Sequence, residues 1–100
     1  INESLAVALL TNLLKNAFVH NIDGGHIRIT VTKNSITFRN SGVENPLDKE
    51  HIFERFYQGT KKEGSTGLGL AIADSICRLQ HLSIRYYFEQ KEHCFEISRQ

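Results

Sequence analysis

Hydrophobic side chains recur every three or four positions through the first part of the chain, which predicts a helix with one buried face. The positions that share this face are Leu5, Ala6, Leu9, Leu10, Leu13, Leu14 and Ala17. The pattern stops at the Gly24–Gly25 pair. A second helix is predicted to begin near Gly67, where the same spacing returns. Its apolar positions are Leu68, Ile72, Ile76 and Leu79.

Alternating apolar and polar side chains, which are typical of half-buried strands, follow each helix. Segments 27–31 and 36–38 alternate on either side of a Lys33–Asn34 turn and predict a hairpin. Segments 84–88 and 94–98 predict two further strands. A short helix is predicted over 48–57, and an exposed loop over 58–66, which holds no aliphatic side chain. Paired antiparallel strands separated by helices predict an α+β fold, a two-layer α/β sandwich.

Composition narrows the class of protein. The 100 residues are 40% hydrophobic and 23% charged, which are ordinary values for one globular domain over 1–100. The net charge of +1 argues against a dedicated nucleic-acid surface, and no apolar stretch is long enough to span a membrane. Cys77 and Cys94 form neither a CxxC pair nor a metal-ligand spacing, which favours reduced thiols. Because the sequence contains no methionine, even at its first position, we expect it to be either processed or part of a longer protein.

Asn12 and Asn16 lie four residues apart and therefore project in nearly the same direction from the first helix, beside its apolar face. A buried amide without hydrogen bonds costs about 1–3 kcal/mol, and asparagine is a poor helix former. A single asparagine of this kind is usually an amide that is hydrogen-bonded in the core or at its rim. Two with the same orientation are less easily explained in this way. The functional alternative is that neutral amide oxygens face a cleft and coordinate Mg²⁺ together with phosphate oxygens.

Glycine is concentrated between Gly59 and Gly69, where four of the seven glycines lie. Gly67 and Gly69 stand at the start of the second helix, although glycine costs about 1 kcal/mol relative to alanine in helical geometry. Exposed main-chain N–H groups at a helix N-terminus bind anions, and glycine lets a phosphate approach that backbone closely. The segment predicts a phosphate site or, equally well, a turn that caps a helix. It is neither a P-loop nor a dinucleotide fingerprint.

Two further segments have both a structural and a functional interpretation. Three aromatic side chains occur within 52–57, where they can pack on the core and also form the hinge of a lid over a ligand. Asn40, Ser41 and Gly42 follow the strand that ends in Phe38, and turns are common after strands. The functional alternative is that a polar side chain at the strand end contacts the edge of a base.

These four features, in the order in which they occur along the chain, resemble the ATP-binding catalytic domain of sensor histidine kinases, a member of the Bergerat-fold ATPase and kinase superfamily. Residues 11–17 match its N box, 52–57 its F box and 64–72 its G2 box, so that the resemblance covers nearly the whole chain. The resemblance implies the Bergerat ATP-binding fold, with a mixed sheet and helices on one face. It also implies ATP and Mg²⁺ as cofactors.

The resemblance implies roles for particular residues. Asn16 would bind Mg²⁺, and Asn12 stands where hydrolysing members carry a glutamate that activates water. Because an amide cannot act as a general base, phosphoryl transfer is favoured over hydrolysis, and Asn12 and Asn16 are the implied catalytic residues. The implied ATP-binding residues are Asn12, Asn16, His20, Asn40, Gly42, Arg55, Phe56, Lys61, Lys62, Ser65, Thr66, Gly67, Leu68, Gly69 and Leu70.

Three positions depart from the pattern of the family. Asn40 replaces the aspartate that accepts a hydrogen bond from the adenine amino group, although an amide oxygen can still accept one. That aspartate begins the G1 box of the family, and Glu44 replaces the second glycine of this box. Val19 replaces a basic residue that commonly follows the N box. Positive charge could instead come from Lys61, Lys62 or Arg55.

The resemblance also implies partners that the chain does not contain. None of the five histidines heads the His-Glu/Asp-x-x-x-Pro pattern of a phosphoacceptor helix, so a dimerisation and phosphoacceptor segment is expected before residue 1 of the parent protein. A response-regulator receiver domain is the expected second partner. The parent would be a homodimer and the isolated domain a monomer, located in the cytoplasm even where the parent is an inner-membrane sensor. Three alternatives stay open: a domain of this fold that signals by docking without kinase activity, a hydrolysing ATPase, and a serine kinase of the anti-sigma-factor type.

Overall fold

The computed structural model describes residues 3–19, 21, 24–42, 51–53 and 69–99. Within them lie the helices α1 (Glu3–Val19) and α2 (Gly69–Leu79). The strands are β1 (Ile27–Val31), β2 (Ser35–Ser41), β3 (Leu82–Glu89) and β4 (Glu92–Arg99). The two long helices and the two pairs of strands predicted from the hydrophobic pattern are therefore confirmed. The predicted start of the second helix near Gly67 lies outside the described residues.

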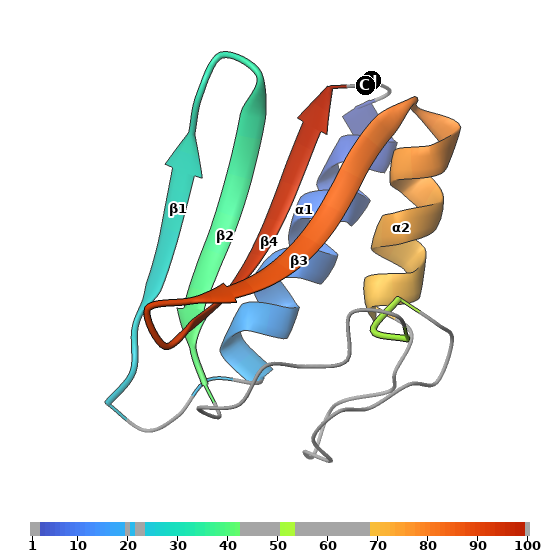
Figure 1. Cartoon of the computed structure of the whole chain (residues 1–100). Helices are drawn as coiled ribbons and strands as arrows, with labels where there is room; N and C mark the ends of the chain where they lie inside the picture. The colour runs from blue at the N-terminus through green and yellow to red at the C-terminus, as the bar shows by residue number, and fades with distance from the viewer. Residues whose placement is uncertain (1–2, 20, 22–23, 43–50, 54–68, 100) are drawn as a thin grey trace.

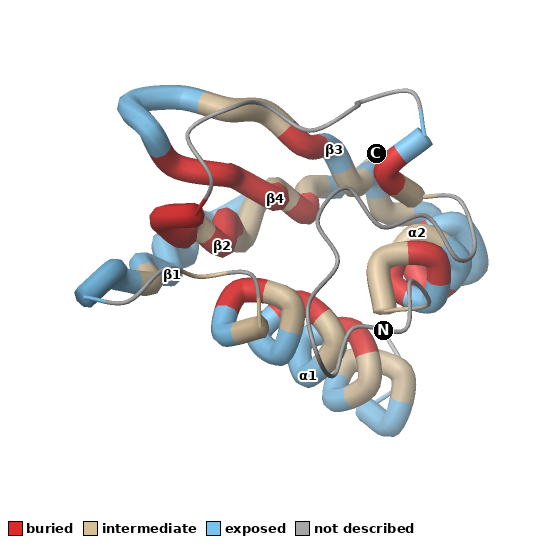
Figure 2. Tube along the Cα trace, turned by 90° about the horizontal axis from the view of Figure 1, so that it is seen from below, coloured by how far each residue is buried: buried red, intermediate tan, exposed pale blue. Residues whose placement is uncertain are grey.

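The four strands form one sheet in the order β1-β2-β4-β3, and both helices lie on the same face of it (Figure 1). Figure 2 shows the same two layers from below, with the strands in one layer and the helices in the other. The two-layer α+β sandwich is confirmed. The expected mixed sheet is not what the described strands form, because all three of their pairings are antiparallel. The last strand of the chain, β4, lies between β2 and β3.

The core lies between the sheet and the helices. The strands contribute Phe38 from β2 and Phe95 from β4, whose exposed fractions are 3% and 2%. Leu13 of α1 is 1% exposed, and Ala73 of α2 is completely buried. The remaining members of this buried cluster are Leu9, Ile52, Ile76, Cys77, Tyr86 and Ile97. Burial of this apolar surface is the main contribution that holds the helices on the sheet.

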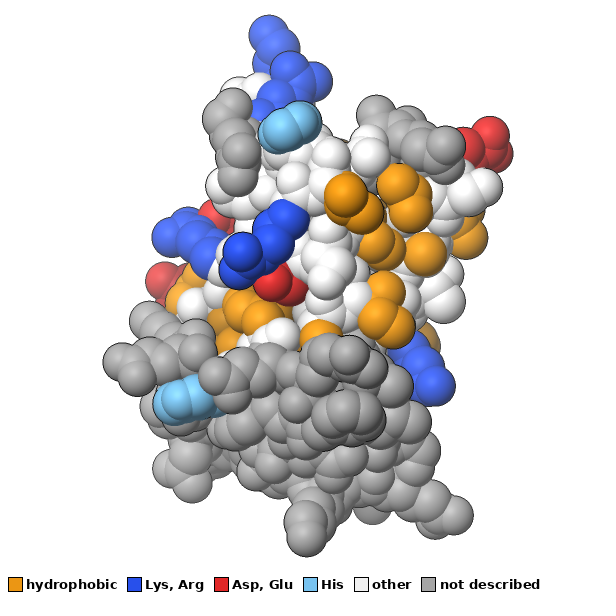
Figure 3. Space-filling model, turned by 90° about the vertical axis from the view of Figure 1, so that its right-hand side faces the viewer, with side chains coloured by type: hydrophobic (Ala, Val, Ile, Leu, Met, Phe, Trp, Pro, Cys, Tyr) orange, Lys and Arg blue, Asp and Glu red, His pale blue; other side chains and the backbone are white. Residues whose placement is uncertain are grey.

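Both helices also expose hydrophobic side chains. Leu10 and Leu14, which were predicted on the buried face of α1, are 38% and 37% exposed. In α2, Ile72 and Leu79 are likewise exposed although the pattern placed them on the buried face. Figure 3 shows the side of the molecule that lies on the right in Figure 1, and a group of exposed hydrophobic side chains is visible there. The predicted buried faces were wrong at these positions, because each helix packs along a narrower stripe than its apolar spacing allows.

The aromatic segment is described only at its beginning. Residues 51–53 form a turn; the rest of the short helix predicted over 48–57, and the loop predicted over 58–66, lie outside the described residues. Ile52 is 2% exposed, and the ring of Phe53 meets that of Phe95 edge-on at a centroid distance of 6.2 Å. These contacts fix the start of the aromatic segment on the core.

Two properties expected from composition can be compared with the structure. Cys77 and Cys94 are both buried and form no disulfide. Burial raises the pKa of the Cys77 thiol to about 11, so that it stays protonated at neutral pH. Within the described residues, neither helix combines the length and the apolar character that crossing a membrane requires.

Candidate functional site

Parts of three secondary-structure elements lie at the same end of the molecule. The second half of α1, the end of β2 and the beginning of α2 all lie at the lower end of the view in Figure 1. These elements carry Asn12 and Asn16, Asn40, and Gly69 respectively. The structure therefore places residues from three of the sequence motifs, which were singled out independently, on elements that converge at the same end of the molecule.

The amide of Asn12 is oriented by its own helix. Its Nδ2 donates a hydrogen bond to the main-chain oxygen of Ala8, one turn earlier, at 2.8 Å. Its Oδ1 faces the beginning of α2, because a Cβ placed on Gly69 would lie 3.4 Å from this oxygen. A glycine at this position thus leaves room for about one methyl group between the first residue of α2 and Asn12. Asn16 follows one turn later on α1 and is half-buried.

Asn40 presents a buried acceptor that lacks a partner. It is 2% exposed, and its Nδ2 donates to the main-chain oxygen of Ser41 at 2.8 Å. Its Oδ1 has no hydrogen-bond partner in the described part of the chain. A buried acceptor left unpaired costs about 1–3 kcal/mol, so this atom is suited to a ligand that brings a donor.

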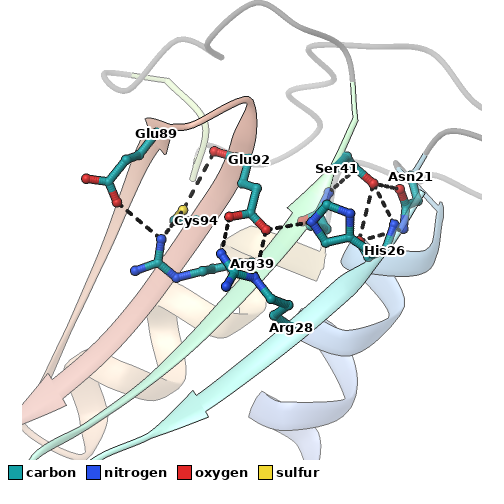
Figure 4. A network of polar contacts seen from close by, with 9 residues as sticks. Asn21, His26, Arg28, Arg39, Ser41, Glu89, Glu92 and Cys94 are labelled. Atoms are coloured by element: carbon teal, nitrogen blue, oxygen red, sulfur yellow. Dashed lines mark hydrogen bonds and ion pairs between the residues drawn. The ribbon is translucent and has the colours of Figure 1, made fainter.

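Ser41 is the centre of a group of hydrogen bonds that the sequence did not reveal (Figure 4). Its Oγ accepts the main-chain N–H of His26 at 2.8 Å and donates to Oδ1 of Asn21 at 2.5 Å. The Nδ2 of Asn21 in turn donates to the main-chain oxygen of His26 at 3.2 Å. Asn21 also donates its main-chain N–H to the oxygen of Phe18 in α1, at 3.4 Å. The hydroxyl therefore connects the end of β2 with the end of α1.

A second polar cluster lies beside Ser41 on the face of the sheet away from the helices. Glu92 is paired with Ser41 across the β2–β4 ladder, and its side chain is 5% exposed. Its carboxylate accepts hydrogen bonds from Nε and Nη2 of Arg28, and it lies 2.7 Å from Nε2 of His26. These bonds, first those from Arg28 and then that from His26, lower the pKa of Glu92 against the opposing effect of desolvation. The sequence offered no signal for this cluster, since it depends on which strands pair.

The remaining predicted site residues divide into two groups. Gly42 is buried after β2, and Leu70 is half-buried in α2, packed against the core. The others lie outside the described residues: His20, Arg55, Phe56, Lys61, Lys62, Ser65, Thr66, Gly67 and Leu68. Their roles stay predictions.

The described donor set can be compared with the needs of a nucleotide and a metal ion. In the part of the chain that the structure describes, no three His, Cys, Asp or Glu side chains gather closely enough to hold a metal ion by themselves. An Mg²⁺ ion in this site would therefore need phosphate oxygens beside the amide oxygens of α1, which is how this ion is commonly bound. The orphaned Oδ1 of Asn40 and the gap at Gly69 fit a base and a phosphate, respectively.

Comparison with known proteins gives consistent results. The family model described as histidine kinase-, DNA gyrase B- and HSP90-like ATPase matches residues 1–98. The sensor histidine kinase RppB of Synechocystis sp. is 43% identical over 84 residues, which cover 75% of this chain and 18% of that protein. The heme sensor protein HssS of Staphylococcus aureus is 39% identical over 90 residues, which cover 85% of this chain and 20% of that protein. The chain thus spans about a fifth of the length of these curated relatives.

Solved structures show the same fold. The catalytic domain of histidine kinase ThkA superimposes with a TM-score of 0.77 at 27% identity, covering 96% of this chain and 67% of that one. The mycobacterial sensor histidine kinase MprB gives a TM-score of 0.77 at 21% identity, covering 99% of this chain and 76% of that one. At that identity the second comparison supports the fold alone.

Proposed function

Because the chain belongs to the family of histidine kinase-, DNA gyrase B- and HSP90-like ATPases, as a histidine kinase catalytic domain, we propose that it binds Mg·ATP and phosphorylates a histidine of a separate domain. The acceptor histidine would belong to a dimerisation domain of the same parent protein. A response-regulator receiver domain would receive the phosphoryl group afterwards. The unit that binds ATP is proposed to be the domain over 1–100.

The orphaned Oδ1 of Asn40 is the observation that carries this proposal. The adenine 6-amino group is a donor of the kind that this buried acceptor lacks. A hydrogen bond between them would remove the cost of an unpaired acceptor, and the gain would appear only when nucleotide binds. The same observation speaks against a domain that has kept the fold but lost the nucleotide, since such a domain gains nothing from a buried unpaired amide oxygen.

The phosphates are proposed to lie between α1 and α2. The beginning of α2 offers main-chain N–H groups and the positive end of a helix dipole, and Gly69 lets an anion approach them closely. Asn16 would coordinate Mg²⁺ through its amide oxygen, and Asn12 would face the phosphate across the gap at Gly69. Lys61 and Lys62 are proposed to add positive charge from the loop.

The chemistry asked of these residues is positioning and charge neutralisation. In phosphoryl transfer the bond between the γ-phosphorus and the ADP oxygen breaks while a bond forms to the attacking imidazole nitrogen, and little covalent help from the protein is needed. Mg²⁺ would neutralise charge that develops on the phosphate oxygens. Asn12 cannot take a proton from water, so transfer to a histidine is favoured over hydrolysis.

Replacing Asn16 with alanine tests the proposal. We expect Asn16→Ala to remove the Mg²⁺ dependence of ATP binding, because the amide oxygen is the proposed ligand on the protein. The measurement is isothermal titration calorimetry with ATP in the presence and absence of Mg²⁺. Asn34→Ala, which removes an exposed amide from the β1–β2 turn, is the control and should bind as the wild type does. A folded Asn16→Ala variant with unchanged Mg·ATP affinity contradicts the proposal.

A further inference from the structure

We infer that Ser41 is a positioning residue for base recognition: its hydroxyl connects β2 to the end of α1 and thereby holds the Asn40 amide with Oδ1 toward the base. The inference rests on the proposed function. It assigns a role to Ser41, which is not among the ATP-binding residues that the resemblance implies. Ser41 itself touches neither base nor phosphate in this account. It acts through Asn40, its neighbour on the opposite face of β2.

An amide needs orientation where a carboxylate does not. Both oxygens of an aspartate accept hydrogen bonds, so rotation of that side chain by 180° changes nothing for a donor on the base. The two ends of Asn40 differ, and the wrong rotation would turn its NH₂ group toward the adenine amino group, donor against donor. A chain that carries asparagine here therefore needs a device that selects one orientation.

The main-chain oxygen of Ser41 provides this selection. It accepts a hydrogen bond from Nδ2 of Asn40 at 2.8 Å, which directs the amino end of the amide into the protein and leaves Oδ1 unpaired. Since this oxygen belongs to the last residue of β2, the orientation of Asn40 depends on how firmly Ser41 is held. Gly42 follows directly and adds no side chain that could hold it.

Ser41 is held from two directions. Its main-chain N–H donates to the oxygen of His26 at 3.1 Å, as in a continuation of the β1–β2 ladder. Its Oγ accepts the N–H of His26 at 2.8 Å and donates to Oδ1 of Asn21 at 2.5 Å, so that its donor and one acceptor position are both used. Ser41 is 8% exposed, and water therefore has little access to replace these bonds.

The bond to Asn21 gives the hydroxyl a role beyond the strand. Asn21 follows α1 and is hydrogen-bonded to it through the oxygen of Phe18. The proposed metal ligand Asn16 lies on the same helix. The Ser41–Asn21 bond thus joins the part of the site assigned to the base with the part assigned to the phosphates, as Figure 4 shows for the two labelled side chains.

The test compares two nucleotides that differ in the group that Asn40 should recognise. ATP carries the 6-amino group, and the triphosphate of purine riboside lacks it. Calorimetry in the presence of Mg²⁺ should show that the wild type binds ATP about three- to tenfold more tightly, the value of one neutral hydrogen bond. Ser41→Ala should bring this ratio close to one, whereas Ser41→Thr, which keeps a hydroxyl, should preserve it.

Two further variants keep the test decisive. Thr37→Val removes another buried hydroxyl from the same strand and face, and should leave the ratio unchanged because Thr37 lies far from the site along β2. Asn21→Ala removes the acceptor of the Ser41 hydroxyl and should lower the ratio even if Ser41→Ala folds poorly. A wild-type ratio retained in folded Ser41→Ala or Asn21→Ala overturns the inference.

Failure of the proposed function gives a different result. If the wild type binds neither nucleotide, the assignment of an ATP site is wrong. If it binds both equally, ATP is bound without the contact from Asn40, and the role of Ser41 falls with that contact. Only a wild type that prefers ATP, together with variants that keep the preference, rejects Ser41 while leaving the proposed function intact.

Discussion

The absence of a side chain at Gly69 matters as much as the side chains around it. The Asn12 oxygen would lie in van der Waals contact with a Cβ at this position, 3.4 Å away, so that a methyl group would fit without displacing the backbone. The described residues around it would therefore accept an alanine at this position. Under the proposed function a phosphate would occupy the space that a methyl group would take, which would explain why this position holds glycine.

Gly69→Ala should separate stability from binding. We expect the variant to be as stable as the wild type or more stable by up to about 1 kcal/mol, because alanine favours helix over glycine. We expect its Mg·ATP affinity to fall about tenfold or more, because the methyl group would stand between the backbone N–H groups and the proposed phosphate. Urea unfolding and calorimetry on the same preparation measure both quantities.

A second substitution in α2 provides the control for Gly69→Ala. Ser75→Ala also replaces a poorer helix former by a better one, but on the exposed side of α2. It should stabilise the helix slightly and leave nucleotide affinity unchanged. Equal affinities for Gly69→Ala and the wild type would show that no phosphate approaches α2 at this residue.

At the scale of elements, the turn between β3 and β4 has an unusual conformation for its sequence. Gln90 and Lys91 connect the paired residues Glu89 and Glu92, and both have positive φ angles, 52° and 62°. Two successive positive φ angles define the type I′ turn, which suits the twist of a hairpin and favours glycine at its second position. A side chain in this conformation costs about 1–2 kcal/mol.

Lys91→Gly should therefore stabilise the protein, by about 0.5–1 kcal/mol once the greater freedom of glycine in the unfolded chain is counted. Chemical denaturation with urea measures the change. Lys33→Gly is the matched control, because Lys33 also lies in a hairpin turn but does not have a positive φ angle. That variant should lose up to about 1 kcal/mol. A loss of stability in Lys91→Gly of similar size would contradict the account of the turn.

The elements themselves could be predicted because their signals are local. Helical spacing identified α1 and put Asn12 and Asn16 on one side of it, and alternation identified both hairpins. Ser41 and Glu92 could not be recognised as neighbours, because their contact depends on the pairing of β2 with β4, and no local pattern encodes which distant strands pair. For the same reason the sequence could suggest Asn40 as a base ligand but could not show that its Oδ1 is buried and unpaired.

At the scale of the whole molecule, the strand order connects distant parts of the chain. Because β4 lies beside β2, Glu92 near the end of the chain reaches Arg28 and His26 near its beginning. The carboxylate is buried, whereas the side chains of both partners are 56% exposed. Loss of the negative charge would therefore weaken contacts across three strands, while water could still solvate the two partners.

Glu92 should make the stability of the protein depend on pH in the acidic range. Its pKa in the folded protein is lowered from 4.5, first by the hydrogen bonds from Arg28, so the ionised form stabilises the fold. This contribution is fully present above pH 4.5 and is lost as the pH falls through the lowered pKa of the folded state. Glu92→Gln should reduce the free energy of unfolding at pH 7 by about 1–3 kcal/mol, and the difference from the wild type should shrink below pH 4.5.

Glu89→Gln, at a carboxylate that is 55% exposed beside Arg39, should change stability by less than about 1 kcal/mol. Urea unfolding of the three proteins between pH 3 and 7, about the range in which carboxylates titrate, provides the comparison, and a Glu92→Gln difference that is constant over this range would contradict the role of the charge.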